Sequence, residues 1–116
     1  MKEYQIQIKL INYLKQKKLS KLRFFHIPNQ GVRSIKYKML LAKMGMKSGC
    51  PDLILEFKGG KMVYIELKTQ KGSLSKSQKL WQNVSNALKT PHYILKGEVN
   101  HLFIQLNNII TKHYEA

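Results

Sequence analysis

Hydrophobic residues recur every three to four positions in two stretches, residues 3–18 and 99–113, which is the period of an amphipathic helix. The apolar positions of the first stretch are Ile6, Leu10, Ile11 and Leu14. A serine, a favoured N-terminal cap, precedes two more helical stretches: Ser34 opens one that runs to about Met44, and Ser75 opens the other. The pattern therefore predicts four helices.

The helix after Ser75 has a clear apolar face. Trp81, Val84 and Leu88 fall at positions i, i+3 and i+7, so they lie along one side of the helix. We expect this side, with Trp81 in the core, to be buried.

Shorter runs of β-branched, aromatic and aliphatic residues lie between these helices and are typical of strands. They cover residues 23–27, 52–57, 61–68 and 91–95. The resulting order, α-β-α-β-β-α-β-α, predicts an α/β fold with a mixed sheet flanked by helices. A chain of 116 residues suits a single domain, which we expect to span residues 1–116.

The second and third strands each carry a stripe of apolar residues at alternate positions. Both stripes face the same layer only if paired residue numbers have an even sum. A register that pairs Leu53 with Ile65 meets this condition, and it also brings Asp52 opposite Glu66. It requires a three-residue loop between the strands with Gly60 in the left-handed conformation.

This register also places Lys68 on the same face as the two acids. Two facing carboxylates repel each other unless a cation lies between them. A hard divalent cation suits carboxylate oxygens. Lys68 in a salt bridge with one of the acids is the alternative.

The net charge is +15, from 21 Lys and Arg against six Asp and Glu. Such an excess favours a polyanionic partner, with nucleic acid as the first candidate, although a generally lysine-rich composition is the alternative. Only two of the cations are arginines, so contacts with the phosphate backbone are favoured over reading of bases. The candidate DNA-binding cations are Arg33, Lys36, Lys43, Lys47, Lys71 and Lys76. For those before Asp52, a solvated helix face is the alternative.

The chain contains one cysteine, Cys50, which excludes an intramolecular disulfide and a cysteine-based zinc site. No apolar stretch approaches the ~20 residues of a spanning helix, and the first residues do not resemble a signal peptide. We therefore expect an intracellular protein without membrane contact.

Pro51-Asp52, followed after thirteen residues by Glu66-Leu67-Lys68, resembles the PD-(D/E)xK nuclease signature. Further motifs narrow the resemblance to the VRR-NUC (virus-type replication-repair nuclease) branch, in a stand-alone form as found in phages and bacteria. These motifs are Gly49-Cys50, Leu74-Ser75 with Gln78 and Trp81, and a first helix that carries Glu3. The resemblance implies a restriction-endonuclease-like fold, in the cytoplasm of a bacterium or a virus-infected cell.

The resemblance also implies roles for individual residues. Asp52 and Glu66 would be metal ligands, together with the backbone carbonyl of Leu67 and, directly or through water, Glu3. Lys68 would orient or help to deprotonate the attacking water. The glutamine of the motif, Gln78, would contact Lys68, a ligand or the scissile phosphate. The implied cofactor is Mg²⁺, with Mn²⁺ as a substitute.

The implied activity is metal-dependent endonucleolytic cleavage of DNA, selective for branched substrates such as Holliday junctions. Because a four-way junction presents two equivalent cuts, a homodimer is expected. Two alternatives stay open: a nicking or restriction-like nuclease, and a non-catalytic DNA-binding module with the same fold.

Overall fold

The structure is a computed structural model that describes residues 1–27 and 34–114. Within these residues it contains four α-helices, four strands and one short 3₁₀ turn, in the predicted order. They are α1 (Glu3–Lys17), β1 (Leu22–His26), α2 (Ile35–Lys43), β2 (Leu53–Phe57), η1 (Lys58–Gly60), β3 (Lys61–Lys68), α3 (Lys76–Ala87), β4 (His92–Lys96) and α4 (Val99–His113).

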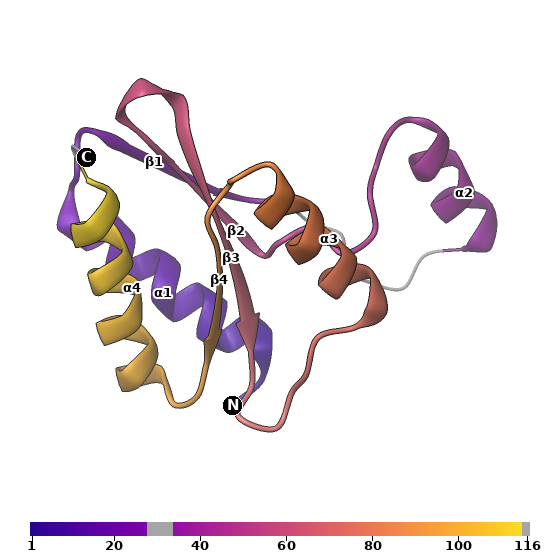
Figure 1. Cartoon of the computed structure of the whole chain (residues 1–116). Helices are drawn as coiled ribbons and strands as arrows, with labels where there is room; N and C mark the ends of the chain where they lie inside the picture. The colour runs from indigo at the N-terminus through magenta and orange to yellow at the C-terminus, as the bar shows by residue number, and fades with distance from the viewer. Residues whose placement is uncertain (28–33, 115–116) are drawn as a thin grey trace.

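The strands form one mixed sheet in the order β1-β2-β3-β4. The first three strands are antiparallel, and β4 lies parallel to β3 after the crossover through α3. Helices α1 and α4 pack beside each other on one face, and α3 lies on the other (Figure 1). The predicted α/β class with a mixed, helix-flanked sheet is confirmed.

The β2–β3 hairpin has the predicted register, with Leu53 opposite Ile65. Its loop is the three-residue turn η1, and Gly60 has a φ of 77° as expected. Gly59 is also left-handed, with a φ of 81°. The ladder ends at Leu53, so Asp52 immediately precedes β2 while Glu66 lies within β3.

The core lies between the sheet and the α1–α4 layer. It is built from the apolar stripes of β2 and β3 and from one face of each helix. Leu10, Leu53, Leu55, Ile65 and Leu106 have no exposed surface. Asp52 and Glu66 lie on the opposite side of the sheet, which is supported by this packed core.

The expected burial of the α3 face is wrong. Val84 is 49 % and Leu88 71 % exposed, and Trp81 is half-buried with its ring edge-on to Tyr64 at a centroid distance of 5.8 Å. In the described structure no further layer covers the outer side of α3. The hydrophobic period shows which side of a helix is apolar, but it does not show whether this chain supplies the cover.

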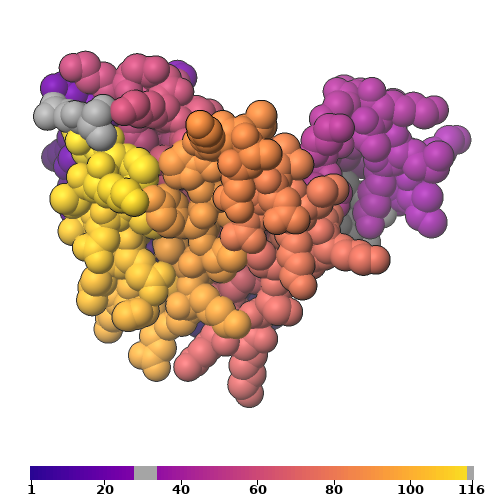
Figure 2. Space-filling view, viewed as in Figure 1, coloured from indigo at the N-terminus to yellow at the C-terminus, as the bar shows by residue number. Residues whose placement is uncertain are grey.

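Helix α2 protrudes from the rest of the molecule (Figures 1 and 2). It begins at Ser34, whose hydroxyl accepts a hydrogen bond from the Tyr37 amide at 3.1 Å, as the predicted cap requires. None of its residues is buried, and Ile35 and Met44 at its ends are 78 % and 74 % exposed.

Among the described residues, no helix is long and apolar enough to cross a membrane.

Candidate active site

The candidate site lies where β2 begins and β3 ends. Because these strands are antiparallel, the start of β2 and the end of β3 fall at the same end of the sheet. Asp52, Glu66 and Lys68 meet there: the amide of Leu67, between Glu66 and Lys68 in the chain, bonds to the Asp52 carboxylate, and the charge of Lys68 lowers the pKa of both acids. The first turn of α1 brings Glu3 to the same place.

Asp52 is 3 % exposed and is fixed through its carboxylate. The backbone amide of Leu67 donates a hydrogen bond to Asp52 Oδ2 at 2.7 Å. Burial raises the pKa of Asp52, while the Leu67 hydrogen bond and the charges of His26 and Lys68 oppose that rise. The carboxylate therefore has a defined orientation across the end of the hairpin.

Glu66 is 1 % exposed, deeper than any other acid in the described chain. The side-chain amide of Gln78 donates a hydrogen bond to Glu66 Oε1, whereas Glu66 Oε2 is buried with no hydrogen-bond partner among the described residues. Burial, and next the charge of Asp52, raises the pKa of Glu66 to about 8. A buried carboxylate oxygen of this kind is unfavourable unless a proton or a cation occupies it.

Gln78 reaches Glu66 from the first turn of α3. Its side-chain oxygen accepts a hydrogen bond from the Ser75 amide at 2.9 Å, and the Ser75 hydroxyl accepts one from the Gln78 amide at 3.2 Å. This reciprocal capping box fixes the rotamer of Gln78 and points its NH₂ group at the acid.

Gly49 sets the distance between this helix start and the loop that leads into Asp52. Its φ is +82°, and a Cβ atom placed there would lie 2.3 Å from the carbonyl oxygen of Ser77 and 2.8 Å from the amide nitrogen of Gln78. Only glycine allows so close an approach of the two backbones.

Glu3 lies at the edge of the site and is half-buried. Burial and then the charge of Asp52 raise its pKa, and Lys68 lowers it. Within residues 1–27 and 34–114, no three His, Cys, Asp or Glu side chains are grouped closely enough to hold a metal ion. The described geometry thus presents two buried carboxylates, Asp52 and Glu66, with Glu3 nearby.

Two residues outside the predicted site set lie beside it: His26, which the sequence suggests as a structural histidine, and Lys96, which the sequence did not single out. His26 Nδ1 lies 2.6 Å from the backbone oxygen of Asp52, so the ring donates there when Nδ1 carries the proton. Lys96 on β4 pairs in register with Lys68 and therefore lies beside it. The position of His26 beside the start of β2 follows once β1 and β2 are paired. The position of Lys96 beside Lys68 follows only from the parallel pairing of β3 with β4.

The predicted DNA-binding cations fall into separate groups. Lys36 and Lys43 are exposed on α2, and Lys47 is exposed in the segment before β2. Lys71 and Lys76 are exposed on either side of the β3–α3 loop, next to the site. Arg33 lies outside the described residues.

Cys50 and Glu56 take no direct part in this arrangement. Cys50 is buried, and desolvation followed by the charges of Glu66 and Asp52 raises its thiol pKa, which keeps it protonated and suits an apolar filler. Glu56 forms an ion pair with Arg23 across the β1–β2 ladder.

The chain is similar to known proteins in both sequence and structure. The model of the VRR-NUC domain family matches residues 1–97. A solved structure described as "VRR_NUC domain protein" superposes with a TM-score of 0.76 at 18 % sequence identity, over 98 % of this chain and 92 % of that one. At this identity the likeness shows the fold. No curated protein matches the chain.

Proposed function

The chain belongs to the VRR-NUC domain family, and from that premise we propose that it is a metal-dependent endonuclease that hydrolyses phosphodiester bonds of DNA. The observation that carries the proposal is the pair of buried acids, Asp52 and Glu66, with Lys68 beside them. A protein that only binds DNA gains nothing from two such carboxylates next to phosphates.

The residues fit a divalent cation. Glu66 Oε2 is buried without a hydrogen-bond partner in the described chain, and the nearby charge of Asp52 makes a proton or a cation necessary there. An all-oxygen donor set of two carboxylates and a backbone carbonyl, that of Leu67, suits Mg²⁺ or Mn²⁺. When bound, such an ion supplies positive charge for the phosphate and lowers the pKa of a water molecule.

The side chains around the acids have supporting roles in this proposal. Lys68 orients the attacking water and stabilises the negative charge that develops on the phosphate. Gln78 fixes one oxygen of Glu66 and leaves the other for the cation. Glu3 acts through a water molecule, which agrees with its position at the edge of the site.

The substrate we propose is branched DNA, such as a Holliday junction. Nineteen of the 21 cations are lysines, which suit phosphate contacts that fix position but carry no base identity. Recognition by shape is then favoured over recognition by sequence. Exposed lysines on α2, and Lys76 at the start of α3, would hold the arms.

We further propose a homodimer. Two helices expose large apolar side chains to a degree that a monomer does not require. On α2 and its C-terminal end they are Ile35, Met39, Leu40 and Met44, and on α3 and its C-terminal end they are Leu80, Val84 and Leu88, with exposed fractions between 49 % and 78 %. A second copy would cover them, and two-fold symmetry would direct two sites at opposite strands.

Cleavage of three matched DNAs tests the proposal: a linear duplex, a flap and a four-way junction, each with Mg²⁺, Mn²⁺ or EDTA. We expect the junction to be cut most rapidly, at near-symmetric positions, and EDTA to stop cleavage. Asp52→Asn should abolish cleavage while DNA binding survives, because a negative charge near phosphates is removed. Glu56→Gln is the matched control, since its ion pair is at the surface.

The other outcomes identify the alternatives. Cutting of one fixed sequence in linear duplex would favour a restriction-like nuclease, and single-strand breaks alone would favour a nicking enzyme. Binding of DNA with no cleavage under any metal would leave a non-catalytic DNA-binding module.

A further inference from the structure

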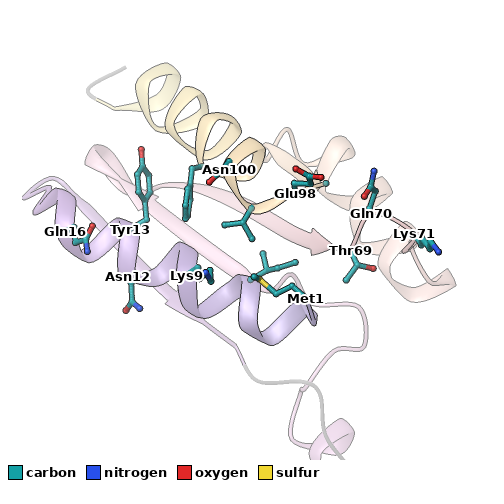
Figure 3. Close-up of a pocket in the computed structure, with 14 residues that line it drawn as sticks. Met1, Lys9, Asn12, Tyr13, Gln16, Thr69, Gln70, Lys71, Glu98 and Asn100 are labelled. Atoms are coloured by element: carbon teal, nitrogen blue, oxygen red, sulfur yellow. The ribbon is translucent and has the colours of Figure 1, made fainter.

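A cleft of about 860 Å³ runs between α1, α4 and the loop after β3 (Figure 3). Its apolar lining includes Ile6, Val99 and the stacked pair Tyr13 and Phe103, whose ring centroids are 4.9 Å apart. None of the acids of the candidate site, Glu3, Asp52 or Glu66, lines it. It is therefore a separate feature of the surface.

The polar part of the cleft is dominated by cations and amides. Lys9 on α1 and Lys71 on the loop stand on opposite sides in Figure 3. Amide side chains come from both helices and from the loop: Asn12, Gln16, Gln70 and Asn100. One carboxylate, Glu98, also borders the cleft.

This combination matches the chemistry of an unpaired nucleotide. Lysines contact the phosphates, apolar and aromatic side chains contact the base, and amides can bond to the exposed donors and acceptors of a base edge. Glu98 would repel a phosphate, but it can accept a hydrogen bond from a base amino group. The volume lies within the roughly 300–1,000 Å³ of a small-molecule site, which suits one or two nucleotides and not a duplex.

The cleft adjoins the candidate active site through the sheet. β3 and β4 are parallel, so both end at the same edge. Lys68 ends β3 and is followed directly by Thr69, Gln70 and Lys71 of the cleft, while the end of β4 leads into Gly97 and Glu98. A DNA strand with its scissile phosphate at Lys68 would enter the cleft along Thr69 and Gln70.

We propose that this cleft binds the unpaired nucleotide next to the scissile phosphate, and so contributes to selection of branched DNA. The inference rests on the proposed function, since it presumes a DNA substrate at Lys68. It adds a binding site for single-stranded DNA to the nuclease site. Duplex arms contact the lysines outside it.

The experiment compares a blunt duplex with the same duplex that carries a ten-nucleotide flap of dT, both in Ca²⁺ or EDTA so that binding is measured without cleavage. We expect the wild type to bind the flap DNA roughly five- to tenfold more tightly, as one stacked base would give. Asn100→Trp, which narrows the cleft from α4 without any change of charge, should remove this preference and leave the affinity for blunt DNA unchanged.

A charge test complements the filling variant. Lys9→Ala with Lys71→Ala should reduce the ratio of the two affinities, whereas Lys58→Ala with Lys112→Ala removes the same charge outside the cleft and should preserve the ratio. Thermal unfolding of each variant verifies that it is folded. Thr69→Trp, on the loop side of the cleft, provides a second filling variant if Asn100→Trp fails to fold.

Equal binding of flap and blunt DNA by the wild type would overturn the proposal, as would a preference that survives both filling variants. In either case, Mg²⁺-dependent cleavage of DNA that Asp52→Asn abolishes would leave the proposed nuclease function intact. Absence of both DNA binding and cleavage would instead overturn the two together.

Discussion

Gln78 holds Glu66 with the same side-chain amide that caps α3. Its oxygen accepts from the Ser75 amide, and its nitrogen donates to Glu66 Oε1. The position of a proposed metal ligand on β3 is therefore coupled to the start of the helix that follows.

Gln78→Ala should lower cleavage roughly 10- to 100-fold, the usual cost of losing a partner that orients a metal ligand. Ser75→Ala is the matched control, because it removes the cap hydroxyl but leaves the side-chain amide of Gln78 and its hydrogen bond to Glu66 in place. It should cost about 1 kcal/mol of stability with little loss of rate. Initial rates and thermal unfolding of both variants give the comparison, and equal rate losses would show that Gln78 acts through the helix cap and not through its hydrogen bond to Glu66.

Gly49→Ala should destabilise the fold far more than a left-handed φ alone explains. The new Cβ would lie 2.3 Å from the backbone oxygen of Ser77, which cannot move away as a side chain could. Gly59→Ala has almost the same φ, with nothing within 4 Å of its Cβ, and should cost only about 1–2 kcal/mol. Urea unfolding of the pair separates the clash from the backbone strain; similar midpoints would refute the close approach.

The stability of the metal-free protein should fall as the pH rises from about 4.5 to 8. Over this range Glu66 stays protonated in the folded state, with a pKa of about 8, while in the unfolded state it has lost its proton near 4.5. The folded state thus binds more protons, and stability decreases with pH by up to a few kcal/mol. Thermal unfolding of wild type and Glu66→Gln in EDTA tests this, and the variant should show a flatter profile.

Metal should oppose that decline. Binding needs the deprotonated carboxylate, so the increase of the unfolding temperature on addition of Mg²⁺ should be larger at pH 8 than at pH 6. A metal effect that is independent of pH, or that persists in Glu66→Gln, would argue against Glu66 as a ligand.

His26→Ala should weaken the affinity for Mn²⁺ as well as cleavage, because the ring contacts the Asp52 backbone oxygen and steadies the turn that presents this carboxylate. His26→Asn offers an N–H donor at a similar position and should recover part of the affinity. Isothermal titration with the metal alone measures this without a substrate. Identical losses in the two variants would indicate that the histidine contributes only to strand packing.

The wild type should be a dimer by light scattering, and Leu88→Lys on the exposed side of α3 should shift it to a monomer. Ile104→Lys on α4 is the control, since Ile104 is also exposed, at 59 %, but lies on another helix. A monomeric wild type at micromolar concentration would remove the proposed assembly, while the proposed chemistry at Asp52 and Glu66 would stand.

Most of the fold could be predicted from local sequence patterns and from the pairing of neighbouring strands. The alternate apolar residues of β2 and β3 determined the Leu53–Ile65 register, since a slip of one residue would have exposed the whole stripe. Asp52 and Glu66 followed from that register. The helix caps at Ser34 and Ser75 are equally local, because the hydroxyl and the amide it binds are three residues apart.

What sequence could not provide depends on contacts between distant segments. Gly49 against Ser77 and Lys96 beside Lys68 both arise from the crossover through α3, which brings β4 next to β3. The exposure of Leu88 was missed for a related reason. An apolar helix face predicts that another element packs on it, but among the described residues of this chain no element covers Leu88.

The β1–β2 connection has a further consequence. The chain leaves the sheet after His26 and returns opposite it at Leu53, so the two ends of this long excursion are adjacent in space, as in a hairpin. Because both ends of this segment are anchored in the sheet, α2 can be shortened, replaced or enlarged without any change in the order of the strands. Such variation would alter which parts of a bound molecule the α2 segment contacts, while the β2–β3 hairpin keeps its structure.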